Sequence, residues 1–143
     1  MVRTDHSPPP TPSAATTSVG IDHVRLSYPY LDSGNLDAYA SLLHHDVQLK
    51  RPDLPEAHGR DEVLKLLAAV AGPPGQHQLY KVLGDGDCVV ATGRTTGRHG
   101  PRCPQTILDV DFADFITLSD EGLLLGIRRF YYYAPMTCDC DFP

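Results

Sequence analysis

The chain has 143 residues, of which 41% are hydrophobic and 21% are charged, with a formal net charge of −6. This length fits one domain with its own core, and the acidic balance argues against nucleic acid as a partner because a basic surface is missing. No apolar run approaches the roughly 20 residues that a membrane-spanning helix needs, so we expect an ordinary globular domain without a membrane partner.

The two ends of the chain are predicted to lie outside this domain. Residues 1–18 are rich in Pro, Ser and Thr and lack the apolar stretch of a secretory signal. Without an export signal, we expect the cysteines to be reduced thiols of a cytoplasmic protein. Cys138 and Cys140 lie in a tail, residues 135–143, and two such ligands without a second pair favour an incidental tail over a metal site. The domain is thus expected over residues 19–134.

The first ordered element is predicted to be a helix that starts near Ile21 and ends before Gly34. Apolar residues recur there at helical spacing, and Pro29 inside the segment should kink the helix. Asn35 is a suitable N-cap for a second helix, which carries Leu36, Tyr39, Ala40 and Leu43 at helical spacing and gives way to a short strand over residues 47–50.

A third helix carries an apolar stripe from Val63 to Val70, with Asp61 and Glu62 in its first turn, where carboxylates stabilise the helix dipole. The segments that follow are predicted to be strands over residues 78–83, 88–97, 107–118 and 123–133. Helices followed by an antiparallel meander predict an α+β fold, in which three helices cover one face of a curved sheet and leave a pocket between the layers.

Asp114 is the most informative residue, because it interrupts an otherwise apolar strand face between Phe112 and Ile116. A carboxylate on such a face must lose its charge, pair with a cation or collect hydrogen bonds. Each outcome is a familiar way to build an active site. A structural acid tied to a nearby donor, or a shifted register, would explain the same pattern, so both interpretations stay open.

Arg129 is the leading candidate partner of Asp114. If the last two strands pair across a four-residue turn, Asp114 lies opposite Ile127, with Arg129 diagonal to it and within reach of a long side chain. A shifted register would bring Arg128 to this face instead. Buried ion pairs often stabilise a fold no better than apolar residues do, so such a pair is weak support for a purely structural role.

Other side chains are candidates for the pocket wall. Arg94 shares a strand face with two threonines, which fits either a pocket wall or a solvent-exposed face. Tyr28 on the first helix and Tyr131 on the last strand fit either the core or a pocket hydroxyl. His44 and His45 precede an aspartate, but adjacent side chains at a helix end seldom meet. The sequence contains no phosphate-loop, metalloprotease or nucleophile-elbow motif.

Four stretches of the chain carry a family resemblance: Leu31-Asp32-Ser33-Gly34-Asn35-Leu36-Asp37-Ala38-Tyr39, Gly59-Arg60-Asp61-Glu62-Val63, Phe112-Ala113-Asp114-Phe115 and Ile127-Arg128-Arg129-Phe130-Tyr131-Tyr132. Over about residues 20 to 134, the sequence resembles SnoaL-like proteins of the nuclear transport factor 2-like superfamily. The resemblance implies a cone-shaped sheet wrapped around helices, a pocket at its wide end and a dimer. Members include polyketide cyclases, ketosteroid isomerases, epoxide hydrolases and binding modules, so the fold alone does not decide the activity.

Comparison with two branches of this family limits the roles that Asp114 can have. Asp114 resembles by position the protonated acid of the ketosteroid isomerase oxyanion hole, but the general base of that branch would fall at Arg51. The epoxide hydrolase branch needs an Asp–Arg–Asp group. Arg94 resembles its arginine, whereas its acids would fall at Thr96 and Arg129. The remaining pocket, one acid among arginines, favours an ionised Asp114 that acts as a base or anchors an arginine.

The sequence therefore predicts a cofactor-independent cyclase or isomerase that acts by acid/base catalysis on a carbonyl-bearing, polyketide-like molecule of secondary metabolism. Asp114 would move a proton, and Arg129 would orient it. The expected substrate-binding residues are Tyr28, Arg51, Arg94, Phe112, Ile127 and Tyr131. We expect a cytoplasmic homodimer that binds a small molecule and needs no metal or organic cofactor. The alternatives are a non-catalytic binding module and a dimerisation domain whose cavity is filled by its own side chains.

Overall fold

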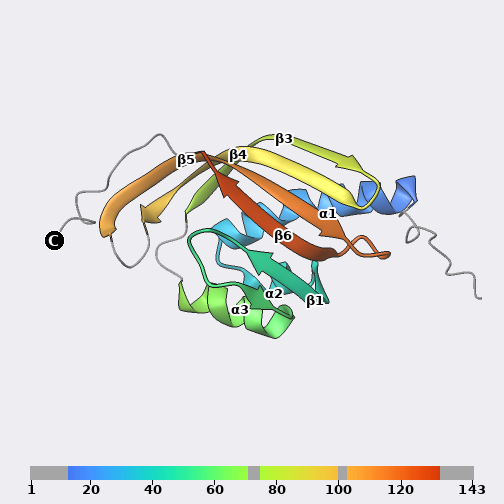
Figure 1. Cartoon of the computed structure of the whole chain (residues 1–143), viewed down its shortest axis with the longest axis horizontal. Coiled ribbons are helices and arrows are strands. Elements are labelled where there is room, and N and C mark those ends of the chain that lie inside the picture. Colours follow the sequence, from blue (N-terminus) through green and yellow to red (C-terminus); the bar gives the residue numbers. More distant parts are fainter. Residues whose placement is uncertain (1–12, 71–74, 100–102, 133–143) are drawn as a thin grey trace, which may run out of the picture.

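A computed structural model of the chain describes residues 13–70, 75–99 and 103–132 (Figure 1). Its elements are α1 (Ala14–Asp32), α2 (Leu36–Ala40), β1 (Leu43–Lys50), β2 (Ala57–His58), α3 (Arg60–Ala69), β3 (Gln76–Asp85), β4 (Cys88–His99), β5 (Cys103–Leu118) and β6 (Leu124–Tyr131). The predicted α+β class is confirmed: one curved sheet packs against the helices, with α1 running along its inner side (Figure 1). The described helices include none long and apolar enough to cross a bilayer.

The sheet has the strand order β2-β1-β6-β5-β4-β3. All neighbouring pairs are antiparallel except β1 and β6, which are parallel. The predicted antiparallel meander, β3 to β6, is confirmed, whereas the parallel pairing of β1 with β6 departs from the expected antiparallel sheet. Tight turns, which the sequence shows, force antiparallel neighbours, whereas two strands far apart in the chain can pair in either direction.

Helix α1 begins earlier than predicted. Ser13 caps it by accepting a hydrogen bond from the backbone N–H of Thr16 at 3.1 Å, and residues 14–18 are helical rather than part of an arm. Tertiary contacts explain the difference: the Thr17 hydroxyl donates to the carbonyl of Gly86 at 2.8 Å, and Gly20 packs so closely on Leu118 that a Cβ would collide with it. The rest of the predicted arm, residues 1–12, lies outside the described residues, as does the predicted tail, residues 135–143.

The second helix is shorter than predicted and the strand after it is longer. Asn35 caps α2 as expected, since its side chain accepts from the backbone N–H of Ala38 at 3.2 Å. The chain then leaves the helix, and Leu43 pairs with Leu124 of β6. Leu43 is 1% exposed in the core. The helical spacing of Leu43 predicted that it belongs to the second helix, but its pairing with a distant strand places it in the sheet instead.

The register of β5 against β6 differs from the predicted one by two residues. Asp114 lies directly opposite Arg129 instead of Ile127. The turn is one residue longer than predicted, because Leu118 pairs with Leu124, and one further residue of β6 bulges out between this pair and the next.

The two single-residue shifts add up to an even number, so the face that each later side chain occupies is preserved. Ile127 and Arg129 are 9% and 6% exposed and point to the inner face, whereas Arg128 is exposed. The alternative in which Arg128 faces inward is thereby excluded. Near the turn, Leu124 is buried, whereas Leu123 and Leu125 on either side of it are half-buried.

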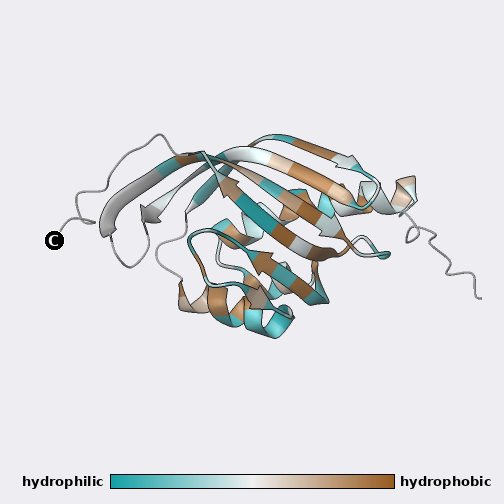
Figure 2. Ribbon diagram, in the orientation of Figure 1, coloured by the Kyte–Doolittle hydropathy of each residue, from teal (hydrophilic) through white to brown (hydrophobic). Residues whose placement is uncertain are grey.

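The core lies between the inner face of the sheet and the helices. Its strands alternate hydrophobic and hydrophilic residues along their length (Figure 2). Val24 on α1, Val63 on α3 and Val89 on β4 are fully buried within it. Asp114 and Arg129 are the charged side chains buried in the described part of the chain. Their position on the inner face therefore marks where a site should be sought.

Candidate functional site

Asp114 and Arg129 form a buried ion pair on the inner face of the sheet. The Arg129 Nε donates to Asp114 Oδ1 at 2.8 Å and its Nη2 donates to Oδ2 at 2.9 Å. This two-point contact fixes both side chains. Burial alone would lower the pKa of the guanidinium, but the hydrogen bonds and charge of Asp114 outweigh it and raise that pKa. The guanidinium also lies over the Phe112 ring, 4.4 Å from its centroid.

Tyr28 brings a third hydrogen bond to the same carboxylate. Its hydroxyl donates to Asp114 Oδ2 at 2.7 Å from the C-terminal part of α1, and the side chain is 4% exposed. Burial, followed by the charge of Asp114 and this hydrogen bond, raises the pKa of the phenol. Tyr28 therefore remains a protonated donor across the neutral pH range.

His77, at the start of β3, links this group to the end of α1. Its Nε2 lies 3.2 Å from Arg129 Nη2, and its Nδ1 lies 2.5 Å from Asp32 Oδ1. A guanidinium can only donate, so the Nε2 must accept and the proton of a neutral ring must sit on Nδ1, facing Asp32. Burial, and then the charge of Arg129, lower the pKa of His77 although Asp32 opposes them. His77 is thereby held as a neutral acceptor.

This arrangement predicts a specific dependence of stability on pH. Because the folded-state pKa of His77 lies below its ordinary value of 6.5, the unfolded chain binds more protons just below that pH, so the stabilisation is complete above it and is lost as the pH falls. The His77→Gln side chain can still accept from Arg129 and donate to Asp32. We therefore expect this variant to lose less stability than the wild type as the pH falls. Urea unfolding of both proteins between pH 7.5 and 5.5 measures the difference. Identical pH slopes would contradict the assignment.

Arg51, just after β1, joins the network at its outer end. Its Nε and Nη2 donate to the two carboxylate oxygens of Asp53 at 3.1 and 2.7 Å, and its Nη2 also donates to the Tyr131 hydroxyl at 2.9 Å. Burial alone would raise the pKa of Asp53, but the hydrogen bonds and charge of Arg51 lower it overall. The Tyr131 hydroxyl also lies 3.5 Å from Arg129 Nη1, so one phenol bridges the two arginines.

These groups surround a small cavity of about 30 Å³. Its polar lining comes from Ser27, Tyr28, Tyr39, Arg51, Asp114 and Arg129, and leucine and isoleucine side chains form the rest. A cavity of this volume holds about two water molecules. Acid, arginines and phenols therefore converge on an enclosed space that is apolar on its other sides.

A comparison with known protein families identifies the fold to which this site belongs. The model of the SnoaL-like domain matches residues 24–125. The chain belongs to the SnoaL-like family. This confirms the resemblance found in the sequence. No functionally curated protein matches the sequence of this SnoaL-like protein.

Solved structures agree with this assignment. A candidate SnoaL-like polyketide cyclase from Jannaschia sp. CCS1 is 19% identical, with a TM-score of 0.72 over 85% of this chain and 91% of that chain. A candidate ketosteroid isomerase from Kribbella flavida is 20% identical, with a TM-score of 0.68 over 85% and 84%. An epoxide hydrolase of the LEH-like type from M. tuberculosis is 16% identical, with a TM-score of 0.69 over 81% and 84%. At these identities, the similarity shows the shared fold alone.

Most of the site residues predicted for the SnoaL-like protein come together. Asp114, Arg129, Tyr28, Arg51 and Ile127 line the cavity. The other two that reach the network do so from beside the cavity: Phe112 packs under the guanidinium of Arg129, and Tyr131 accepts hydrogen bonds from both arginines.

Arg94 is the predicted site residue that the fold takes elsewhere. Its side chain is 49% exposed and forms an ion pair with Asp109 on the neighbouring strand. The inner face of β4 carries Val89 and Ala91, both fully buried, so Arg94 belongs to the outer face. Alternation separates the two faces of a strand but does not tell which face is inside, and the side shared with two threonines proved to be the outer one.

Four residues of the site escaped the sequence-based prediction: Asp32, Asp53 and His77 of the network, and Tyr39 of the cavity wall. Asp32 and His77 are 45 residues apart, and no spacing rule relates them. Two signals were available. His77 alternates with Leu79, a half-buried residue of the same strand, and Asp32 lies inside one of the stretches that resemble the family.

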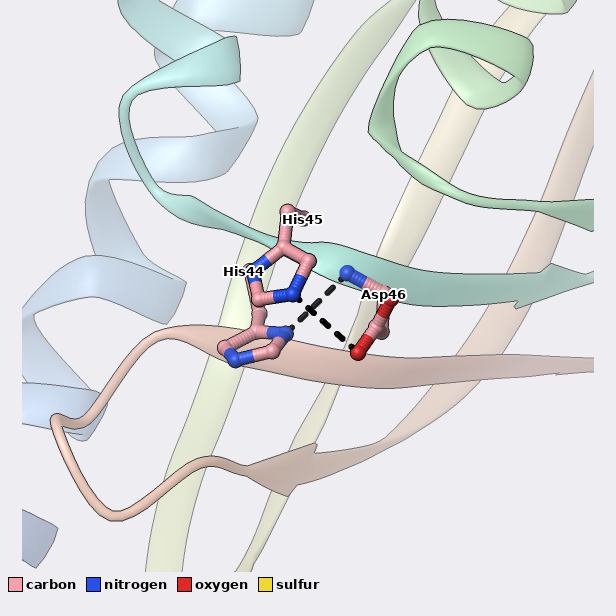
Figure 3. Close-up of side chains that lie close together, drawn as sticks. All are labelled: His44, His45 and Asp46. Atoms are coloured by element: carbon pink, nitrogen blue, oxygen red, sulfur yellow. Dashed lines mark hydrogen bonds and ion pairs between the residues drawn. The ribbon is translucent and has the colours of Figure 1, made fainter.

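A second group of titratable side chains lies on β1 and does not line the cavity. His45 Nε2 lies 3.2 Å from Asp46 Oδ2, and the His44 ring stacks on the His45 ring at 4.2 Å (Figure 3). The expectation that these neighbours would not meet was wrong, because β1 is irregular between Leu43 and Gln48. Three side chains of types that can bind a metal thus lie together, but His45 and Asp46 are 69% and 72% exposed.

Proposed function

We propose that this SnoaL-like protein is a cofactor-independent cyclase or isomerase that acts by acid/base catalysis on a carbonyl-bearing, polyketide-like molecule of secondary metabolism. The observation that carries the proposal is Asp114, a carboxylate that is 2% exposed and yet borders the cavity. An acid held among fixed donors at the wall of a small cavity is typical of catalytic groups. Placing the protein in the cytoplasm is part of this proposal.

In the proposed reaction, Asp114 removes a proton from the carbon next to a substrate carbonyl. Arg129 holds the carboxylate in a fixed orientation, and the guanidinium of Arg51 stabilises the negative charge that develops on the carbonyl oxygen. In an isomerase, Asp114 returns the proton to a different carbon. In a cyclase, the enolate carbon attacks a second carbonyl of the same molecule, and the new alkoxide takes the proton.

The test uses the metabolites of a strain that lacks the gene. We expect a precursor to accumulate and to disappear again when wild-type protein or Arg94→Gln is supplied, because Arg94 lies on the outer face. Asp114→Asn should leave the precursor in place. A strain whose metabolites are restored by Asp114→Asn as fully as by the wild type would refute the catalytic role of Asp114.

The small size of the cavity and the hydrogen bonds already made by Asp114 favour a second function. The cavity is about 30 Å³, and both oxygens of Asp114 already accept hydrogen bonds. These features suit a module that binds a small molecule without converting it, since a larger substrate requires the apolar walls to move. Purified protein that binds the accumulated precursor and releases it unchanged would decide for this function.

The proposal includes a homodimer formed through the outer face of the sheet. Phe115 and Phe130 are each 45% exposed and contact each other edge to face at 5.5 Å. Tyr80 and Tyr132 are more exposed still, at 56% and 76%. Exposed aromatic groups of this kind are enriched in protein interfaces.

A charge on this face should break the dimer. We expect Phe130→Glu to weaken self-association by about tenfold or more, because it places a carboxylate in an aromatic contact. Val70→Glu is the matched control, since Val70 is also 45% exposed but lies at the end of α3. Sedimentation velocity over a range of concentrations measures both. A dimer that survives Phe130→Glu, or a wild-type monomer, would exclude this interface.

A further inference from the structure

The hydroxyl of Tyr39 is a donor that the network leaves free. Tyr39 lies on α2, is 3% exposed and lines the cavity. Its hydroxyl makes no hydrogen bond within the part of the chain that the structure describes. Every fully enclosed polar side-chain atom of those residues has a partner. The oxygen of Tyr39 therefore cannot be fully enclosed and must open into the cavity that its side chain lines.

Arg51 offers a second free donor at the same cavity. Asp53 and Tyr131 occupy its Nε and Nη2, whereas its Nη1 has no partner among the described residues. A guanidinium has five N–H groups in one plane, so the two on Nη1 remain available. The side chain of Arg51 is 20% exposed, against 38% for Asp53. Solvent therefore screens the negative charge of Asp53 more than the positive charge of Arg51.

The other polar groups of the cavity wall are already engaged. The hydroxyl of Ser27 donates to the carbonyl of Val24 at 2.6 Å, and that of Tyr28 donates to Asp114. Each guanidinium nitrogen of Arg129 also has a partner. The free groups identified here are donors, and the apolar part of the wall consists of leucine and isoleucine side chains. They complement an apolar molecule with one electron-rich oxygen.

We propose that Tyr39 and Arg51 form an oxyanion site, which takes the acidic oxygen of an enol or a carboxylic acid on a small apolar molecule. The inference rests on the proposed function and names its substrate class: carbonyl compounds that enolise readily, such as 1,3-dicarbonyls. The bound oxygen accepts from the Tyr39 hydroxyl and from Arg51 Nη1, and the positive charge of Arg51 favours its ionised form. The negative charge of Asp114 opposes this ionisation, and its ion pair with Arg129 offsets only part of that opposition.

The chemistry of Tyr39 supports a role as donor. Burial, and then the charge of Asp114, raise the pKa of its phenol, while the charges of Arg51 and Arg129 only partly offset this effect. The phenol therefore keeps its proton at neutral pH and can donate it to a bound oxygen. Tyr39 lines the same cavity as Asp114, Arg51 and Arg129.

The test uses two small probes, acetylacetone for the enol and acetate for the carboxylate. Binding is followed by nuclear magnetic resonance titration, and the ionised form of bound acetylacetone by its ultraviolet difference spectrum. We expect wild type and Arg94→Gln to bind alike and to favour the ionised enol. Tyr39→Phe and Arg51→Gln should each bind about tenfold or more weakly, because each loses a hydrogen bond to a charged group. Thermal melting checks that both variants are folded.

The outcomes separate this site from the proposed catalysis. Binding of acetate but not of acetylacetone supports the oxyanion site and assigns it to carboxylic acids. Failure of the wild type to bind either probe, or equal binding by folded Tyr39→Phe and Arg51→Gln, overturns the site. If the wild type binds a probe through Tyr39 but the gene deletion accumulates no precursor, the oxyanion site stands and the catalytic proposal fails.

Discussion

Replacing Arg129 by Leu is expected to lower the free energy of unfolding by about 3–5 kcal/mol. The substitution leaves the carboxylate of Asp114, 2% exposed, with Tyr28 as its remaining hydrogen-bond partner among the described residues. A buried charge without its counter-ion costs far more than the pair itself contributes, because it has lost its hydration and gained nothing in exchange. Urea unfolding followed by circular dichroism at pH 7.5 measures the loss.

Arg94→Leu is the matched control for this prediction. It also removes an arginine from an ion pair, but one on the exposed outer face, where solvent screens the charges, so little change is expected. A double variant, Asp114→Leu with Arg129→Leu, should recover much of the lost stability, since an apolar pair often replaces a buried ion pair at little cost. If Arg129→Leu unfolds no more easily than Arg94→Leu, the pair is not buried as the structure places it.

Replacing Asp114 by Asn is expected to lower kcat/KM for the substrate by about 10²–10⁴-fold. An amide is almost the same size as a carboxylate but cannot take up a proton, so the proposed base is lost while the cavity keeps its shape. Purified protein assayed with the precursor that accumulates in the deletion strain provides the measurement.

This variant also places an amide against a buried guanidinium, so its folding must be checked separately. Assays well below its melting temperature, with circular dichroism on the same samples, distinguish a lost base from a lost fold. Tyr28→Phe is the graded comparison: it removes one hydrogen bond from the same carboxylate and should reduce kcat/KM by about tenfold. An unchanged rate in folded Asp114→Asn would exclude the residue as the base.

The central pair of the site could be predicted from the sequence because its signal is local. Two-residue alternation placed Asp114 on an apolar face, and the same rule placed Arg129 on the facing strand. The predicted register was wrong by two residues, yet both side chains kept their faces. An even shift of the register leaves each side chain on the same face of its strand. The predicted pairing of Asp114 with Arg129 was therefore right, although the predicted register of the hairpin was not.

The parts of the site that were missed depend on contacts between distant segments. His77 meets Asp32 across 45 residues of chain, and Tyr39 reaches the cavity because α2 ends early and lets β1 enter the sheet. The spacing in the sequence placed Tyr39 on a helix, but nothing in the sequence showed that it borders the cavity or that His77 meets Asp32. Arg94 was misplaced for a different reason: two polar neighbours indicate a polar strand face, but only the packed sheet decides which side is solvent.

The extra residue of β6 at Leu125 also constrains how this hairpin can change in length. A change between Leu118 and Ile127 that shifts the pairing of β6 with β5 by one residue would turn every later side chain of β6 over, burying Arg128 and exposing Arg129. A change of two residues would leave the orientation intact. We therefore expect natural relatives that keep the ion pair to differ here by even numbers of residues. Loop grafts into this protein should likewise succeed when they change the length of the hairpin by an even number of residues.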